Sequence, residues 1–154
     1  MLVYLIRHAH AVDAGEDPER PLSDRGTAQV RSIAAFLKQT KEFQPEEFWH
    51  SPLIRSQETA ELLAKRLHLD VSVTLMPDLE PEDDPRAIAR RIKAATVPIA
   101  IVGHEPHLSS LASLLIAGRP EPAKFVMKKA AVLALEGIGD HWMVRWHIHP
   151  DLVA

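Results

Sequence analysis

Two arginines and two histidines stand where secondary-structure elements are expected to begin or end. Arg7 and His8 follow one apolar run, and His104 follows another. Arg55 lies between them, at the beginning of a helical pattern. A guanidinium group binds a phosphate through two parallel hydrogen bonds, and a neutral imidazole is a competent nucleophile. These residue types indicate chemistry on a phosphoryl group.

The two apolar runs, Leu2–Ile6 and 98–102, have the length and the β-branched content of buried strands. Open α/β sheets bind their ligands at the carboxyl ends of such strands. If the two strands are neighbours, His8 and His104 meet at one rim of the sheet, and Arg55 reaches that rim from its helix. His8 can then attack phosphorus in line, while the arginines and a protonated His104 hold the phosphoryl oxygens.

Strand and helix patterns alternate along most of the chain. Further strands are expected at 48–51, 71–75, 130–135 and 141–149, and helices after Ser23, from Arg55, over about 86–95, and between Pro106 and Gly118. The last two strands are separated by the turn 137–140 and predict an edge hairpin. This order predicts a three-layer α/β sandwich in which helices flank a mostly parallel, mixed sheet. At 154 residues, we expect a single domain over 1–154.

Composition excludes several kinds of protein. The chain has no cysteine, which removes disulfides and thiolate catalysis, and its formal net charge of −3 argues against a nucleic-acid partner. The apolar start is too short for a signal peptide, and no stretch approaches the length of a membrane span. We therefore expect a cytoplasmic protein with no cofactor and no metal.

Four ordered motifs resemble the histidine phosphatase superfamily, which has the phosphoglycerate-mutase-like fold. They are Arg7-His8-Ala9, Pro21-Leu22-Ser23-x-x-Gly26, Ser51-Pro52-Leu53-x-Arg55-x-x-x-Thr59-Ala60 and Val102-Gly103-His104-x-Pro106. The small size and the run Gly103-His-Glu-Pro-His-Leu108 are most similar to its SixA-type branch of phosphohistidine phosphatases. The resemblance implies that His8 is the nucleophile and that Arg7, Arg55 and His104 bind the phosphoryl group. Ser23 is a further candidate for phosphate binding.

Two positions leave questions open. Ala9 replaces the glycine that usually follows the nucleophile in this family, and it would be strained if the position needs a positive φ. Glu80, in an acidic, proline-rich loop, matches the approximate place of the carboxylic acid that many members use to protonate the leaving group. SixA-type members can lack this acid, so Glu80 is either a working acid or a loop carboxylate.

The other histidines have simpler interpretations. His10 is expected to be a bystander, and His107 is expected at the surface rather than at the pocket mouth. His141, His147 and His149 share the parity of one strand face and could bind zinc or copper. A histidine-rich sheet edge is the simpler interpretation.

The leading hypothesis is a metal-independent phosphatase that forms a phosphohistidine intermediate. So short a chain has little room for insertions over its site, so we expect an open pocket that admits a phosphorylated histidine on a partner. That partner would be a histidine phosphotransfer or phosphocarrier domain, and the enzyme itself is expected to be a monomer. The alternatives are a broad-specificity phosphomonoesterase that uses Glu80 and a non-catalytic module that binds phosphate or a phosphoprotein.

Overall fold

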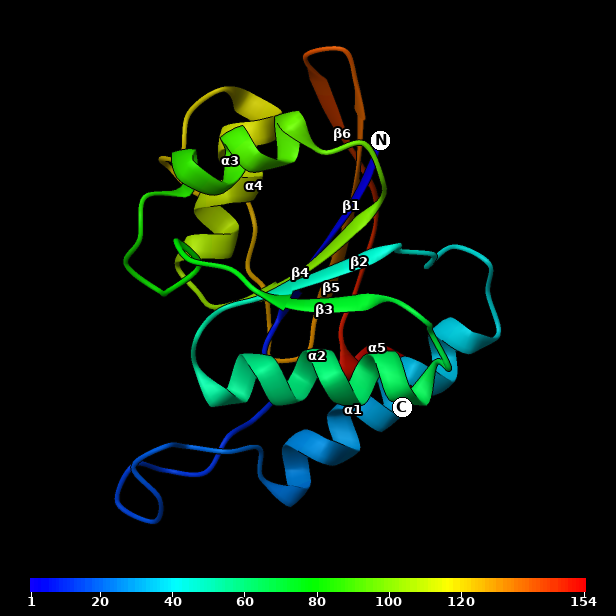
Figure 1. The fold of residues 1–154 in the computed structure, drawn as a ribbon, viewed down its shortest axis with the longest axis vertical. Coiled ribbons are helices and arrows are strands. Elements are labelled where there is room, and N and C mark those ends of the chain that lie inside the picture. The colour runs from blue at the N-terminus through cyan, green and yellow to red at the C-terminus, as the bar shows by residue number, and fades with distance from the viewer.

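The computed structural model describes residues 1–154, and its six strands form one sheet with helices on both faces (Figure 1). The strands are β1 (Leu2–Arg7), β2 (Glu47–His50), β3 (Ser72–Leu75), β4 (Ile99–Gly103), β5 (Val132–Ile138) and β6 (His141–Ile148). The helices are α1 (Asp24–Lys38), α2 (Ile54–Arg66), α3 (Pro85–Ala94), α4 (His107–Ala117) and α5 (Pro150–Val153). No helix is both long and apolar enough to cross a membrane.

The strand order is β3-β2-β4-β1-β5-β6, which makes β1 and β4 direct neighbours. They run parallel, with Arg7 opposite Gly103 at their carboxyl ends. The first four strands of this order are parallel, whereas β5 runs antiparallel to both β1 and β6. The expected mixed sheet with a hairpin at one edge is confirmed.

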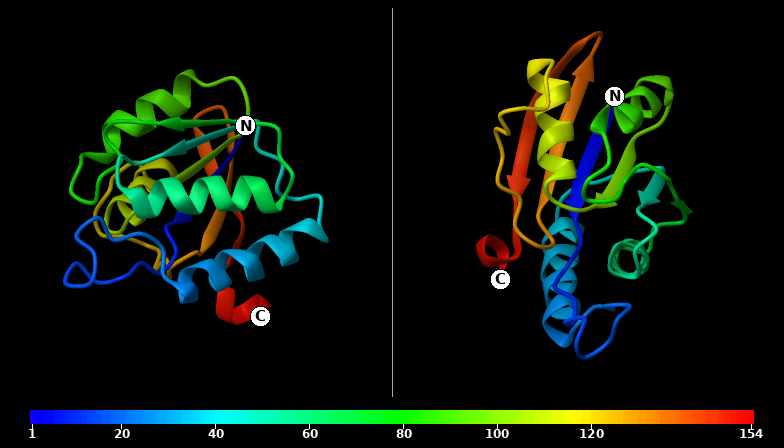
Figure 2. Two further views of the ribbon diagram at one scale, coloured as in Figure 1. Left: turned by 60° about the horizontal axis from the view of Figure 1, so that its bottom comes forward. Right: turned by 90° about the vertical axis from the view of Figure 1, so that its left-hand side faces the viewer.

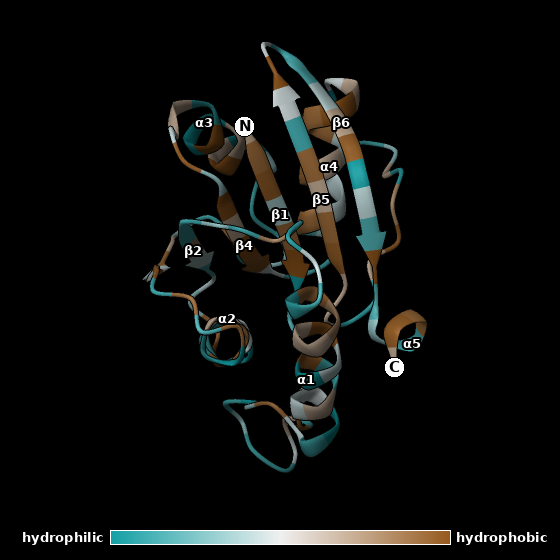
Figure 3. Cartoon of the chain, turned by 90° about the vertical axis from the view of Figure 1, so that its right-hand side faces the viewer, coloured by the Kyte–Doolittle hydropathy of each residue, from teal (hydrophilic) through white to brown (hydrophobic).

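Alternate residues of the central strands feed two separate cores, which gives the molecule its three layers (Figure 2). Tyr4 and Ile6 of β1 pack towards α1 and α2, whereas Val3 and Leu5 pack towards α3 and α4. β1 and β4 are apolar throughout most of their length, as Figure 3 shows, because both of their faces are covered. Because such a strand is packed on both faces, it holds the polar residues at its end in a fixed position.

The beginning of α1 depends on Ser23 and Gly26. The Ser23 hydroxyl caps the helix by accepting a hydrogen bond from the Gly26 N–H at 3.1 Å. A Cβ atom at Gly26 would lie 2.0 Å from the carbonyl oxygen of His10. This close backbone approach explains a glycine in the first turn, where it costs helix propensity.

Several expected boundaries are corrected. β5 extends to Ile138, so only Gly139 and Asp140 form the hairpin turn. Pro106 lies just before α4 rather than in its first turn. The pairing of β5 with β6 shifts between Ala134 and Leu135, which leaves Arg145 in a bulge. Side chains on β6 change face at this bulge, so sequence parity does not hold along the whole strand.

Candidate active site

His8 and His104 meet at the carboxyl ends of β1 and β4, as the sequence predicts. The two ring centroids lie 5.0 Å apart at an interplanar angle of 51°. The His8 N–H donates to the carbonyl oxygen of Gly103 at 3.0 Å, so the parallel pairing continues one residue past β1. Both side chains are largely buried, with 6% of His8 and 1% of His104 exposed.

One hydrogen bond determines which nitrogen of His8 is reactive. His8 Nδ1 lies 2.7 Å from the carbonyl oxygen of Ala9. Because a carbonyl oxygen only accepts, Nδ1 carries the proton and Nε2 keeps its lone pair. Burial, with smaller contributions from the charges of Arg55 and Arg7, lowers the pKa of His8 to about 4 despite the opposing effect of this hydrogen bond. His8 is therefore a neutral imidazole with a free Nε2 at neutral pH.

The backbone after His8 is tied to α2. The Ala9 N–H donates to Thr59 Oγ1 at 3.0 Å, and the Thr59 hydroxyl donates to the carbonyl oxygen of Arg55 at 2.7 Å. Ala9 is fully buried in the core and is not among the residues with positive φ. The methyl group that replaces the usual glycine hydrogen thus causes no backbone strain.

His104 is oriented by two serines whose role the sequence analysis missed. His104 Nε2 lies 2.6 Å from Ser51 Oγ and 3.0 Å from Ser56 Oγ, and both serines are fully buried. Nδ1 has no partner. Burial, followed by the charges of His8 and Arg55, lowers the pKa of His104 to about 3. This pKa favours a neutral ring, and the protonated His104 that is expected when the ring holds a phosphoryl group stays a prediction.

The two guanidinium groups keep unused donors. Arg7 Nη1 donates to the carbonyl oxygen of Met127 at 2.9 Å, which anchors one side of the group. The Nε atoms of Arg7 and Arg55 are both buried without a hydrogen-bond partner. Burial and the charge of Arg20 lower the pKa of Arg55, although it remains a cation at neutral pH. A buried donor without a partner is costly, and a bound anion would satisfy it.

The segment 127–131 also contributes to the site, and the sequence analysis did not identify it. The Ala130 N–H donates to the carbonyl oxygens of both Arg7 and His8, at 3.1 and 3.2 Å. Ala130 itself has a φ of 61°. The neighbouring Lys129 is close enough for its charge to help lower the pKa of His8. In the sequence, only the adjacent positive charges of Lys128 and Lys129 could have indicated that this segment lies near an anion-binding site.

Two sequence-predicted candidates make no hydrogen bond or salt bridge to the four-residue cluster of Arg7, His8, Arg55 and His104. The Ser23 hydroxyl caps α1 and lies 2.6 Å from His10 Nδ1, so its hydrogen-bonding capacity is used there. Glu80 is exposed and its side chain makes no hydrogen bond or salt bridge. The preceding Leu79 is buried, and its carbonyl oxygen approaches Gly103, so the loop passes beside the end of β4.

The remaining histidines differ partly from expectation. His107 is 1% exposed, so the expected surface position is wrong: the first turn of α4 turns its ring inward. His10 has a structural role, because its backbone and ring contact Gln29 and Ser23. The bulge in β6 places His141 on the opposite face from His147, and no three histidines or carboxylates are grouped to hold a metal.

Comparison with known proteins agrees with this geometry. Residues 3–80 match the family model of the histidine phosphatase superfamily (branch 1). Phosphohistidine phosphatase SixA of Escherichia coli (strain K12) is 28% identical over 155 residues, covering 97% of this chain and 94% of that protein. An uncharacterized protein of Picosynechococcus sp. is 30% identical over 142 residues, and the match covers 88% of this chain and 84% of that protein.

Solved structures have the same fold. The protein histidine phosphatase SixA complexed with tungstate superposes with a TM-score of 0.88 at 24% identity, covering all of both chains. An alpha-ribazole phosphatase from Shigella flexneri gives 0.76 at 20% identity, covering 94% of this chain and 95% of that one. The chain therefore belongs to the histidine phosphatase superfamily, as a hydrolase of the phosphatase class.

Proposed function

We propose that the chain removes the phosphoryl group from a phosphorylated histidine on a partner protein, through a phosphoenzyme intermediate on His8. The observation that carries this proposal is the tautomer of His8. With Nδ1 donating to Ala9, the lone pair of Nε2 is free to attack phosphorus. The lowered pKa keeps this nucleophile unprotonated at neutral pH.

The proposed first step forms a bond from His8 Nε2 to phosphorus and breaks the bond from phosphorus to the substrate imidazole. A phosphorylated imidazole protonated on its other nitrogen leaves as a neutral ring, so no enzyme acid is required. Water then attacks the phosphoryl group on His8, which releases inorganic phosphate and regenerates the free imidazole. Arg7, Arg55 and His104 are proposed to bind the phosphoryl oxygens, and their cationic and polar donors serve without a metal ion.

Two features support a protein substrate over a small metabolite. The cavities beside α3, α4 and the β5–β6 hairpin, beside β2, and between α1 and α2 are not lined by any member of the four-residue cluster. None of these cavities therefore encloses the rest of a small substrate beside the cluster. The Escherichia coli relative is itself described as a phosphohistidine phosphatase. The histidine phosphotransfer or phosphocarrier domains remain the proposed partners, with the chain acting as a monomer.

The test is rapid mixing with a ³²P-labelled, phosphohistidine-bearing transfer domain, followed by an alkaline quench that preserves phosphohistidine. Wild type should accumulate label on His8 and release phosphate equally well in EDTA. His8→Ala should form no phosphoenzyme and lose at least a thousandfold in turnover, whereas His141→Gln, an exposed histidine on β6, should match wild type. Full turnover by His8→Ala, or a much higher kcat/KM on small phosphate esters, would contradict the proposal.

A further inference from the structure

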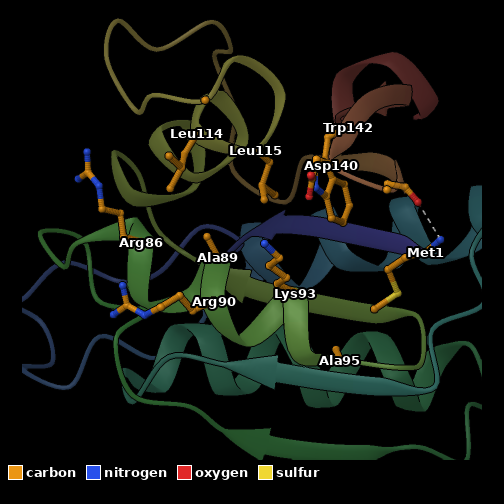
Figure 4. Close-up of a pocket in the computed structure, with 13 residues that line it drawn as sticks. Met1, Arg86, Ala89, Arg90, Lys93, Ala95, Leu114, Leu115, Asp140 and Trp142 are labelled. Carbon is orange, nitrogen blue, oxygen red and sulfur yellow. Dashed lines mark hydrogen bonds between the residues drawn. The ribbon is translucent and has the colours of Figure 1, made fainter.

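A large cavity lies at the opposite end of the sheet from the four-residue cluster. It has a volume of about 620 Å³ and lies between α3, α4 and the β5–β6 hairpin (Figure 4). Met1, which precedes β1, lines it, whereas His8 follows the other end of that strand. Small-molecule sites in proteins commonly have volumes of about 300–1,000 Å³. The size of this cleft suits a small organic ligand.

One wall of the cleft is cationic. Arg86, Arg90 and Lys93 follow one another at i, i+4 and i+7 of α3, so they share the helix face that borders the cleft. Arg86 pairs with Asp84 at 3.4 Å, but neither Arg90 nor Lys93 has a carboxylate within salt-bridge distance. Asp140 is the only acidic residue of the lining.

This concentration of positive charge is unusual for the chain, whose formal net charge is −3. A cleft with like charges along one wall concentrates the field and attracts ligands of the opposite sign. The cleft is therefore electrostatically suited to an anion.

The opposite wall is aromatic and held in place by a glycine. Trp142 of β6 pairs with Gly137 of β5, and a Cβ atom at Gly137 would lie 2.7 Å from Cζ2 of the indole. Only glycine leaves room for the ring to lie flat against the strand. The tight turn at Gly139, with a φ of 61°, keeps the hairpin short and the indole close to the cleft. Trp142 thus offers a flat aromatic surface, and the close-up shows its ring beside the cleft.

We propose that this cleft is a second ligand site, for an organic anion that carries a flat aromatic ring and a phosphate or carboxylate group. Lys93, whose ammonium group points into the cleft, binds the anionic group with Arg90 at the rim, and the aromatic ring packs against Trp142 above the apolar floor of Ala89 and Leu115. A bare phosphate would leave the aromatic wall unused, and a neutral ring would leave the cations unused. Only a ligand with both parts matches both walls, and a nucleoside monophosphate is the simplest probe.

The test follows AMP binding by NMR in His8→Ala, which avoids hydrolysis of the probe. The indole N–H signal of Trp142 and the amide signals of Gly137 and Gly139 should shift saturably, while the Trp49 and Trp146 indoles serve as internal references. Binding at the catalytic cluster is followed separately through the Ala9 amide. Adenosine and inorganic phosphate should each bind the cleft at least tenfold more weakly than AMP.

Two variants on one helix decide whether the shifts report the proposed contacts. The double substitution Arg90→Gln with Lys93→Gln should weaken AMP binding at the cleft by at least tenfold. Arg91→Gln removes a charge from α3 outside this cleft and should leave the affinity unchanged. Absence of saturable shifts at Trp142, or equal losses in the double variant and in Arg91→Gln, would overturn the proposal.

Discussion

His8 and His104 lie with their ring centroids 5.0 Å apart, and burial holds the pKa of each ring well below its ordinary value. Two imidazoles this close cannot both be charged without repulsion, and Arg7 and Arg55 add to it. The unliganded pocket therefore holds two neutral imidazoles beside two cations. Such a pocket has a net positive charge, which a bound anion would neutralise.

The first prediction concerns protonation. The pKa values of about 4 for His8 and about 3 for His104 lie below the value of 6.5 expected in the unfolded chain. As the pH falls below 6.5, His8 and His104 each bind a proton in the unfolded chain but stay unprotonated in the folded chain. The free energy of unfolding therefore decreases. The slope from these two rings should approach about 2.7 kcal/mol per pH unit between their unfolded and folded pKa values.

Urea unfolding between pH 7.5 and 4.5 measures this slope, and NMR titration of the two rings measures the pKa values directly. Replacing His104 by Asn should remove about half of the slope contributed by the pair. Ring signals of His8 or His104 that titrate near pH 6.5 would contradict the prediction.

The second prediction tests the two serines behind His104. Ser51→Ala combined with Ser56→Ala removes both hydroxyls from His104 Nε2, so the ring loses the contacts that fix its orientation. We expect kcat and kcat/KM to fall together by about tenfold or more, which corresponds to about 1.4 kcal/mol of lost transition-state stabilisation. Steady-state kinetics measures this change, and the NMR-detected pKa of His104 should change as well.

Ser113→Ala is the matched control. Ser113 is equally buried, but its hydroxyl oxygen accepts from the Lys124 N–H, away from the four-residue cluster. Its substitution should lower stability by about 1–3 kcal/mol without a change in kcat. Equal kinetic losses in the control and in the double variant would show that the serines act only through general stability.

The third prediction concerns Gly26. Gly26→Ala would place a methyl group 2.0 Å from the carbonyl oxygen of His10, and this oxygen is backbone, so it cannot turn aside as the end of a flexible side chain can. Overpacking of this kind costs about 1–3 kcal/mol, and the displacement should reach the loop that carries His8. Chemical unfolding should show this loss. Gly15→Ala, which has no atom within 4 Å of the new methyl group, should be neutral, and similar losses in both variants would refute the explanation.

Local patterns in the sequence were sufficient to predict β1, β4 and the residues at their ends. Both strands are short, continuous apolar runs, and ligand groups at the ends of such strands follow from the geometry of parallel sheets. The beginning of a helix after Ser23 was also correctly predicted, because capping depends on residues only three positions apart.

Features that depend on long-range packing were not predictable. Ser51 and Ser56 face His104 only because β2 lies beside β4, and the segment 127–131 reaches Arg7 across more than one hundred residues of sequence. The burial of His107 depends on the direction in which α4 leaves the sheet. The β6 bulge, which separates His141 from His147, arises from pairing irregularity with β5 and leaves no local signal.

The last prediction concerns Glu80 and separates the two enzyme hypotheses. Glu80→Gln should leave kcat/KM on a phosphohistidine protein within about twofold of wild type, because the leaving imidazole supplies its own proton. For simple alkyl phosphates, whose leaving group is a poor alkoxide, loss of a general acid should cost about 10²-fold or more. Glu82→Gln, in the same exposed loop, is the matched control and should affect neither substrate. A large loss on the phosphohistidine protein would mean that the β3–α3 loop closes on the pocket when the partner binds. Equal activity of Glu80→Gln and wild type on alkyl phosphates would instead show that the exposed Glu80 is not the general acid.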